Sequence, residues 1–556
     1  MQILSSKFRS SLLDQVQQEV FDLVVIGGGI TGSGIALDAA SRGMKVALVE
    51  KDDFASGTSS RSTKLIHGGL RYLKQLEIAL VREVGSERAI VHNLAPHLVI
   101  SEKMLLPLVE GGTYGKLATS FGLMVYDFLA GVEGEDKRKM LSKEETTNIE
   151  PLLREDIVVG GGFYAEYRTD DARLTIEIIK AAAKYGAKSI NYARAEQFLY
   201  EDGKIVGVHC KDLRGDRGFD IRSKYVVSAA GPWVDNIRKK DNSLKGKHLF
   251  LSKGSHIVVP HEKLPVQHSV YFDVPDGRMI FTIPRHRMTY IGTTDTPYDG
   301  DINHVLTSQE DVDYLLDAVN NMFPTVHLKS EDVVSSWAGL RPLIHEEGKS
   351  ASELSRKDEI FYSDSGLISI AGGKLTGYRK MAERVVDVVA KKLHEKEDRS
   401  LKSCHTDTIE LGGGPFENAE AVEKYTKVLK AKLVQQDIPD YYAAYLVANY
   451  GQQSNDILQG YKQLEANHPV INLAIAEVQY CIEKELTQTP MDFFSRRSGR
   501  LYFNIDTIPM VLEEVCQEFA RQLNWSEEQL IKERQNINQA LHEAANFAYS
   551  KTLFFY

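Results

Sequence analysis

The sequence predicts an α/β protein that combines a mostly parallel sheet, an antiparallel sheet and an all-helical C-terminal part. Three observations predict this class. A strand–glycine–helix unit lies at residues 21–50, segments that alternate in polarity or are β-branched occur within 246–334, and the residues beyond 405 have almost only helical patterns. The chain has 556 residues, which is enough for two or three domains and a large core.

The first unit, FDLVVIGGGITGSGIALDAASRGMKVALVE, contains the pattern G-x-G-x-x-G at Gly27, Gly29 and Gly32 and ends at Glu50. In a Rossmann-like unit the first glycine makes the tight turn, the second lets a pyrophosphate approach the backbone, and the third lets helix and strand pack closely. The helix N-terminus offers free N–H groups to the phosphates. A carboxylate at Glu50 can bind a ribose hydroxyl, which disfavours the 2′-phosphate of NADP and leaves FAD or NAD. The expected strand, helix and strand lie at 23–26, 30–42 and 46–49.

Charge and cysteine content exclude several classes of protein. The net charge of −10 gives no basic excess to neutralise phosphates, so no nucleic-acid partner is expected. The four cysteines form no C-x-x-C pair, and Cys404–His405 has no further ligands close in sequence, so neither a disulfide framework nor a metal site is expected. The N-terminus lacks the apolar core of a signal peptide, and no apolar run reaches about 18 residues. We therefore expect a cytoplasmic protein.

Two later segments repeat the strand–glycine–helix pattern. One apolar strand runs into AAGPW at 229–233, and another runs into GGKLTG at 372–377. These three junctions are better explained by one sheet, to which the chain returns twice, than by three separate binding sites. We therefore expect an N-terminal arm, an FAD-type dinucleotide domain interleaved with a substrate domain, and a helical C-terminal domain. The expected bounds are 1–20 for the arm, about 21–95, 160–245 and 335–395 for the dinucleotide domain, about 96–159 and 246–334 for the substrate domain (both within 21–400), and 401–556 for the helical domain.

Seven motifs occur along the chain in one order. They are GGGITGSGIALDAASRG, TSSRSTKLIHGGLRYL, AAGPWV, KGSHIVVP, IGTTDTPYDGD, GLRPL and AGGKLTGYRKMAE. In this combination the sequence closely resembles the FAD-dependent glycerol-3-phosphate dehydrogenases, the aerobic respiratory enzymes of bacteria and mitochondria. The likeness covers about residues 20–550. Over the C-terminal helices the match is in the type of secondary structure more than in sequence motifs. It implies the FAD-binding fold of the glycine-oxidase and amino-acid-oxidase class.

The resemblance implies FAD as the cofactor and assigns residues to it. The family's Ala-Thr-Gly-Pro-Trp segment is matched with Ala230 in place of the threonine, which puts one hydroxyl contact in doubt. The positions matched to FAD-binding residues are Gly27, Gly29, Gly32, Glu50, Thr58, Ser59, Ser60, Ser62, Leu65, Gly68, Ala195, Ala230, Gly231, Trp233, Gly373 and Leu375.

The resemblance also implies the substrate, glycerol 3-phosphate. A phosphate of roughly −1.5 to −2 charge needs cations and donors around it, and the family's phosphate-side positions match Arg71, Tyr72, Lys374 and Thr376. The alkoxide that develops when a hydride leaves C2 needs a cation or a base nearby. We assign the cation to Arg341, with Arg356 as a further cation. His67 is the candidate base, with a purely structural role in the FAD loop as the alternative.

Electrons would pass to a membrane quinone, from a protein bound peripherally at the inner face of the cell membrane. The sequence leaves the quinone site and the oligomeric state open, and a homodimer is compatible with it. The helical segment 116–130 is interpreted as buried beside the substrate, or else as a membrane-surface helix. SRRSGR at 495–500 is interpreted as a solvated basic face.

The sequence is compatible with three alternatives to the dehydrogenase function. The first is an oxidase that reduces oxygen to peroxide with the same substrate; such oxidases carry an insertion before the third glycine motif that this chain lacks. The second is a flavin-binding sensor or scaffold, and the third is an amino-acid or amine oxidase. The expected arginine-rich phosphate pocket disfavours the third. No EF-hand loop of the mitochondrial enzymes is present.

Overall fold

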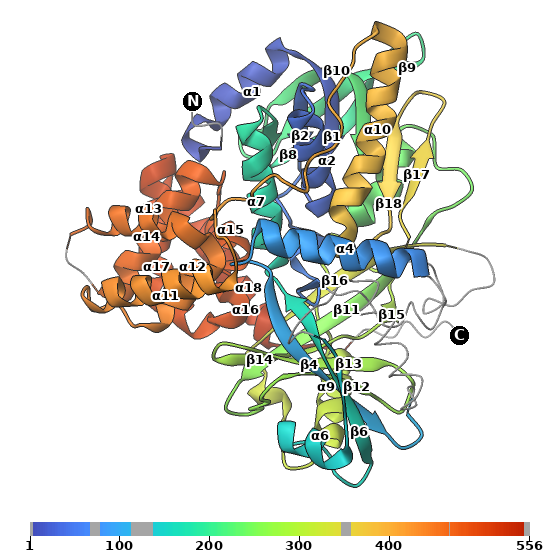
Figure 1. Ribbon diagram of the computed structural model, residues 1–556. Helices are drawn as coiled ribbons and strands as arrows, with labels where there is room; N and C mark the ends of the chain where they lie inside the picture. The colour runs from blue at the N-terminus through green and yellow to red at the C-terminus, as the bar shows by residue number, and fades with distance from the viewer. Residues whose placement is uncertain (1–3, 67–77, 113–136, 346–356, 466–467, 550–556) are drawn as a thin grey trace.

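The computed structural model describes residues 4–66, 78–112, 137–345, 357–465 and 468–549. The predicted α/β class is confirmed. One sheet carries the N-terminal strand-glycine-helix unit, a second sheet lies below it in Figure 1, and helices of the C-terminal part form a separate body beside both sheets. The helix α4 (Ile78–Leu94) crosses the molecule between the two sheets.

The first sheet contains all three strand–glycine–helix junctions, as the sequence predicts. Its strands follow the order β17-β18-β10-β1-β2-β7, and the five from β18 to β7 run parallel. β17 pairs antiparallel with β18, and the β8–β9 hairpin pairs with β10. The strands are β1 (Val20–Ile26), β2 (Val46–Val49), β7 (Lys188–Ile190), β8 (Ala193–Glu201), β9 (Lys204–Asp212), β10 (Gly218–Ser228), β17 (Glu359–Tyr362) and β18 (Ile368–Ala371).

Alternate side chains of β1 pack on opposite faces of this sheet. Leu23 and Val25 join the hydrophobic cluster formed with helices α2, α7 and α10, whereas Val24 and Ile26 join the cluster with α1 and the β8–β9 hairpin. Because both faces are covered, the strand is apolar from Leu23 to Ile26. The helices are α1 (Arg9–Gln18), α2 (Ile30–Ser41), α7 (Asp171–Lys184) and α10 (Tyr378–Glu397).

The second sheet is largely antiparallel, as its alternating segments predict. Its order is β15-β11-β14-β13-β12-β4-β6-β3, with β16 on β11 and β5 on β6. One face packs on the helix α9 (Gln309–Met322), and the other faces the first sheet and the C-terminal helices. The strands are β3 (Leu65–Ile66), β4 (Ile100–Val109), β5 (Lys139–Leu141), β6 (Val158–Arg168), β11 (Leu249–Pro260), β12 (Ser269–Asp273), β13 (Met279–Arg285), β14 (Met288–Gly292), β15 (Thr296–Pro297) and β16 (Ser335–Ile344).

The C-terminal part is helical, as predicted. A single apolar cluster runs through these helices and continues to Trp337 and Tyr290 of the second sheet, so the helical body is packed onto the rest of the molecule. The helices are α11 (Ala419–Val434), α12 (Tyr441–Tyr450), α13 (Ser454–Tyr461), α14 (Pro469–Lys484), α15 (Pro490–Asp492), the π-helical turn η8 (Phe493–Arg497), α16 (Arg500–Phe503), α17 (Ile508–Leu523) and α18 (Glu527–Ala545).

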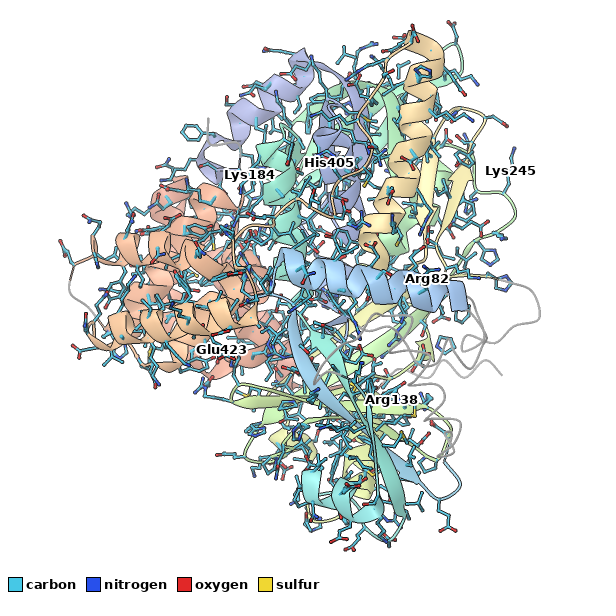
Figure 2. The ribbon with its side chains drawn as sticks, in the orientation of Figure 1. Arg82, Arg138, Lys184, Lys245, His405 and Glu423 are labelled. Carbon is cyan, nitrogen blue, oxygen red and sulfur yellow. The ribbon has the colours of Figure 1, made fainter. Side chains whose placement is uncertain are left out.

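The interpretation of SRRSGR as a solvated basic face is wrong. Arg497 and Arg500 are at most 1% exposed, and Arg496 is 9% exposed. Each is paired with a buried carboxylate, because a charge removed from water needs a partner. Typical solvated charges lie elsewhere: Lys245 and Glu423 are exposed, and Figure 2 shows both at the edge of the molecule.

None of the described helices combines the length and the apolar character that crossing a membrane requires. Among the same residues, no group of three or more histidine, cysteine or acidic side chains is arranged to hold a metal ion.

Candidate active site

A cavity of about 660 Å³ lies at the carboxyl ends of β1, β2, β10 and β18. Ligands of α/β sheets bind at this edge. The predicted cofactor residues that line it are Gly27, Gly29, Glu50, Thr58, Ser59, Ser62, Ala195, Ala230, Gly231, Trp233, Gly373 and Leu375. The structure therefore brings together segments of the chain that lie more than 300 residues apart.

Glycine is required in this turn because other backbone atoms lie very close to it. Gly27 has φ +114°, and a Cβ there would lie 2.5 Å from the Ala229 carbonyl oxygen. A Cβ on Gly32 would lie 1.9 Å from the carbonyl oxygen of Gly27, so a side chain would push α2 away from β1. The N-terminus of α2, at Ile30, consequently faces the cavity and presents its first turn to a phosphate.

Glu50 holds the glycine loop from the neighbouring strand. Its Oε2 accepts a hydrogen bond from Gly28 N at 2.7 Å, and its Oε1 accepts one from Asp52 N at 2.9 Å. Burial, with the nearby charge of Asp52, raises the pKa of Glu50 to about 7. The carboxylate lines the cavity, and its contact with a ribose remains a prediction.

Trp233 closes part of the cavity instead of filling the core. Its Nε1 donates to Asn303 Oδ1 at 2.9 Å, and Lys51 Nζ lies 4.1 Å from the centre of its ring. Asn303 also accepts from Lys51 Nζ at 2.6 Å. A side chain from each of three segments thus meets at one edge of the cavity.

A second cavity of about 160 Å³ continues from the first, because both are lined by Thr58, Ser62 and 372–375. It contains the predicted substrate residues Arg341, Lys374 and Thr376, together with Leu65. Ser60 is buried, and its carbonyl accepts from Lys64 Nζ at 3.1 Å, so it supports the loop rather than lining either cavity.

The guanidinium of Arg341 is fixed by the three residues that follow β14. Its Nη2 donates to Thr293 Oγ1 at 2.9 Å, and its Nη1 donates to Thr294 O at 3.1 Å and to Asp295 Oδ1 at 3.2 Å. A Cβ on Gly254, across the sheet on β11, would lie 2.3 Å from Arg341 Nη2. The guanidinium therefore lies flat on a strand that has no side chain at that point.

His256 is a site residue that the sequence reasoning missed. It lines the second cavity, stacks on Trp337 with 4.9 Å between ring centres, and places Nε2 2.9 Å from Thr63 Oγ1. Its Nδ1 has no hydrogen-bond partner among the described residues. A Cβ on Gly292 would lie 2.1 Å from its ring, so a second glycine makes room for a site residue. Burial, helped by the charges of Arg341 and Lys64, lowers the pKa of His256 well below its usual value.

A buried ion pair supports the loop between the two cavities. Lys64 is 1% exposed and donates to Asp171 Oδ1 at 2.5 Å, while Asp171 Oδ2 accepts from Ser62 N at 3.1 Å and from Ser62 Oγ at 2.7 Å. Trp337 Nε1 donates to Ser62 O at 3.0 Å. The loop that separates cofactor and substrate positions is therefore held from α7 and from β16.

Several predicted residues lie outside the described part of the chain. These are His67, Gly68, Arg71, Tyr72, Arg356 and the segment 116–130.

We expect Gly254→Ala to lower kcat by about 10²-fold, since the added methyl group displaces the Arg341 guanidinium by an ångström or more. The backbone at this position needs no special conformation, so the unfolding temperature should change little. Gly460→Ala, whose Cβ would make only ordinary contacts in α13, is the control. A Gly254→Ala variant with the turnover of Gly460→Ala would show that the position of Arg341 does not matter.

The chain was compared with known proteins. A family model described as FAD dependent oxidoreductase matches residues 22–379, and a model described as the C-terminal domain of alpha-glycerophosphate oxidase matches 404–530. The aerobic glycerol-3-phosphate dehydrogenase of Bacillus subtilis is 48% identical over 543 residues, covering 97% of this chain and 98% of the relative. The Bacillus halodurans glycerol-3-phosphate dehydrogenase complexed with FAD superposes with a TM-score of 0.84 at 43% identity, covering 98% of this chain and 99% of that one.

The fold and the cavity at the glycine turn are those of an FAD-dependent oxidoreductase. The glycine turn without side chains, the helix N-terminus and the cavity of about 660 Å³ all fit FAD, and together with the family match they show that the protein is a flavoprotein. Within that class, the chain belongs to the family of aerobic glycerol-3-phosphate dehydrogenases. An alpha-glycerophosphate oxidase of Mycoplasma pneumoniae, with 18% identity and a TM-score of 0.55 over 69% of this chain and 96% of that one, shares the fold.

Proposed function

We propose that the protein oxidises sn-glycerol 3-phosphate to dihydroxyacetone phosphate and that a membrane quinone is the final electron acceptor. The observation that carries this proposal is the second cavity, where Arg341, His256 and Lys374 lie beside the end of the cofactor cavity. The substrate is supported by the names of the relatives, which are glycerol-3-phosphate dehydrogenases over nearly their whole length.

Bound FAD supplies an acceptor for the hydride that leaves C2 of the substrate. The chain must bind a phosphate and stabilise a developing alkoxide. Lys374 and Thr376 line the cavity and can hold the phosphate, and we propose Arg71 and Tyr72 for the same role. Arg341 remains charged at every relevant pH, so it stabilises the alkoxide without taking the proton. Arg356 is proposed as an additional cation.

The proton of the C2 hydroxyl needs an acceptor, and two histidines are candidates. We favour His256 over His67, because His256 lines the second cavity together with Arg341. Its lowered pKa keeps the imidazole neutral, but it also weakens the imidazole as a base. Arg341 beside it disfavours the imidazolium, but the alkoxide charge that develops with the transfer offsets this repulsion.

The pH dependence of kcat separates these candidates. A base must be unprotonated, so activity is lost as pH falls through its pKa. With His256 as the base, kcat at saturating substrate should stay constant down to well below pH 6.5. His256→Gln should lower it about 10²- to 10⁴-fold at full FAD content. An acid limb near pH 6.5, the value of an ordinary histidine, with loss of turnover in His67→Asn and not in His256→Gln, would move the role to His67.

The acceptor and the location are part of the proposal. We propose a role in glycerol catabolism, with the protein bound peripherally at the inner face of the cell membrane, and a homodimer as a form to be tested. The oxidase alternative predicts a different product. Turnover with a soluble quinone analogue should far exceed turnover with oxygen, and little peroxide should form. Peroxide formed in step with substrate at the rate seen with quinone would establish an oxidase.

A further inference from the structure

Asp53 joins the cofactor domain to the C-terminal helices through a fully buried charge cluster. It is 1% exposed, and it lies three residues after Glu50. Arg497 binds both of its carboxylate oxygens, with Nη1 to Oδ2 at 2.8 Å and Nη2 to Oδ1 at 2.9 Å. Arg496 Nε adds a third bond to Oδ2 at 2.6 Å, and Asn191 Nδ2 a fourth to Oδ1 at 2.9 Å. Burial opposes ionisation, but the two guanidinium groups lower the pKa of Asp53 to about 2.

The two arginines are themselves fixed within the C-terminal part. Arg496 Nη2 donates to Asp492 Oδ1 at 2.8 Å, and Arg497 Nη2 donates to the Glu485 carbonyl at 2.9 Å. Asp492 also caps the short helix α15, since its Oδ2 accepts from the backbone N–H of Gln488 and Thr489. The π-helical turn η8 therefore presents two guanidinium groups in a fixed geometry to one carboxylate of the cofactor domain.

The segment 50–55 that carries Asp53 contacts the glycine turn directly. Ala55 N donates to Gly28 O at 3.0 Å, and Gly28 N donates to Glu50 Oε2 at 2.7 Å. A Cβ on Gly28 would lie 2.8 Å from the ring of Phe54, which shows how closely this segment packs on the turn. Any displacement of Asp53 would consequently move the walls of the cofactor cavity at Glu50 and Gly27–Gly29.

The wall of the cavity formed by Ala193 and Ala195 is reached by a second connection. Tyr192 OH donates to Asp492 Oδ1 at 2.6 Å, and Tyr192 N donates to Asp52 O at 2.8 Å. The next residues along the chain, Ala193 and Ala195, line the cavity. Both connections thus begin at η8 and α15 and end at the cofactor cavity.

We propose that Arg496 and Arg497 are positioning residues for FAD: by holding Asp53 they keep the segment 50–55 against the glycine turn, so that docking of the C-terminal helices and retention of FAD are coupled. This inference rests on FAD as the cofactor and is independent of the substrate and the electron acceptor. Coupling between two sites is reciprocal. FAD should therefore also tighten the docking of η8, and a weakened η8 should release FAD.

The test compares two buried arginines that lie three residues apart. Arg497→Lys keeps a positive charge for Asp53 but loses the two-pronged contact. Arg500→Lys is the control, because Arg500 is equally buried and its Nη2 donates to Glu477 Oε2 at 2.7 Å within the C-terminal part. The FAD dissociation constant, from flavin fluorescence after dilution, and the unfolding temperature are measured for both holoproteins.

We expect Arg497→Lys to raise the FAD dissociation constant by at least about tenfold, a typical coupling between sites. Arg500→Lys should lose a similar amount of thermal stability but keep the dissociation constant of the wild type. Equal dissociation constants for the wild type and Arg497→Lys would overturn the proposal. The proposal would also be overturned if FAD binding weakened in both variants in proportion to the fall in their unfolding temperatures, because this would indicate general destabilisation.

A measurement on the wild type keeps the proposal testable if Arg497→Lys does not fold. Hydrogen exchange of the amides in 485–498 is compared with and without FAD, with the helix α14 (Pro469–Lys484) as the internal reference. The proposal predicts that FAD slows exchange in 485–498 more than in α14. Exchange in 485–498 that is indifferent to FAD would contradict it.

Discussion

Replacing Arg341 by methionine is expected to lower kcat by about 10²- to 10³-fold, the cost of removing one donor from a developing oxyanion, which corresponds to about 2.7–4 kcal/mol. The side chain lies in the second cavity, and its guanidinium is held by Thr293, Thr294 and Asp295 from one side and by the bare strand at Gly254 from the other. Methionine replaces the aliphatic stem and carries no charge, and Arg341 does not line the cofactor cavity, so FAD content should not change.

The measurement is kcat at saturating glycerol 3-phosphate with a quinone analogue, normalised to bound flavin. Arg222→Lys is the control, because Arg222 pairs with Glu201 at the surface and both side chains are exposed. A drop in substrate affinity with unchanged kcat would show that Arg341 binds the substrate and its transition state equally. In that case the alkoxide would need another stabilising group.

Gly32→Ala should yield protein that is purified without FAD. The new methyl group would lie 1.9 Å from the carbonyl oxygen of Gly27, and neither backbone group can move without changing the turn that faces the phosphates. We expect the FAD dissociation constant to rise by more than about 10²-fold, an estimate that assumes about 3 kcal/mol for overpacking at a tight contact. The absorbance ratio of flavin to protein measures this.

Gly43→Ala is the matched control at the other end of the same helix. Gly43 has φ +97° and open space around its Cβ, so alanine there strains the backbone but touches nothing. Its FAD content should equal that of the wild type. If Gly32→Ala retained full FAD content, the glycine turn would not be the pyrophosphate site.

The parts of the site that follow from local geometry could be predicted from the sequence. Gly27 and Gly32 are needed because backbone atoms approach them within one strand–turn–helix unit, so the motif itself carries the information. The shared sheet followed from three similar junctions, and the structure confirms it through the parallel pairing of β10 with both β1 and β18. The placement of Arg341 in a cavity came from resemblance, and the structure places it there.

The parts that depend on distant partners could not be predicted. Arg497 and Asp53 are 444 residues apart, so nothing near SRRSGR in the sequence shows that it is buried. Lys64 is similarly buried because Asp171 lies beside it in space. His256 lies in an apolar strand, KGSHIVVP, and looks like a core residue. The glycine facing it, Gly292, is a signal that reveals its role once the strands are paired.

The most direct test of the proposed function is anaerobic. Glycerol 3-phosphate is added to the purified protein without oxygen, and the visible absorbance of the flavin is followed; glycerol is the control for the phosphate, and dithionite shows that the flavin can be reduced. The proposed function predicts rapid and complete bleaching by glycerol 3-phosphate, little by glycerol, and recovery when a quinone analogue is added. A flavin that dithionite bleaches and glycerol 3-phosphate does not would contradict it.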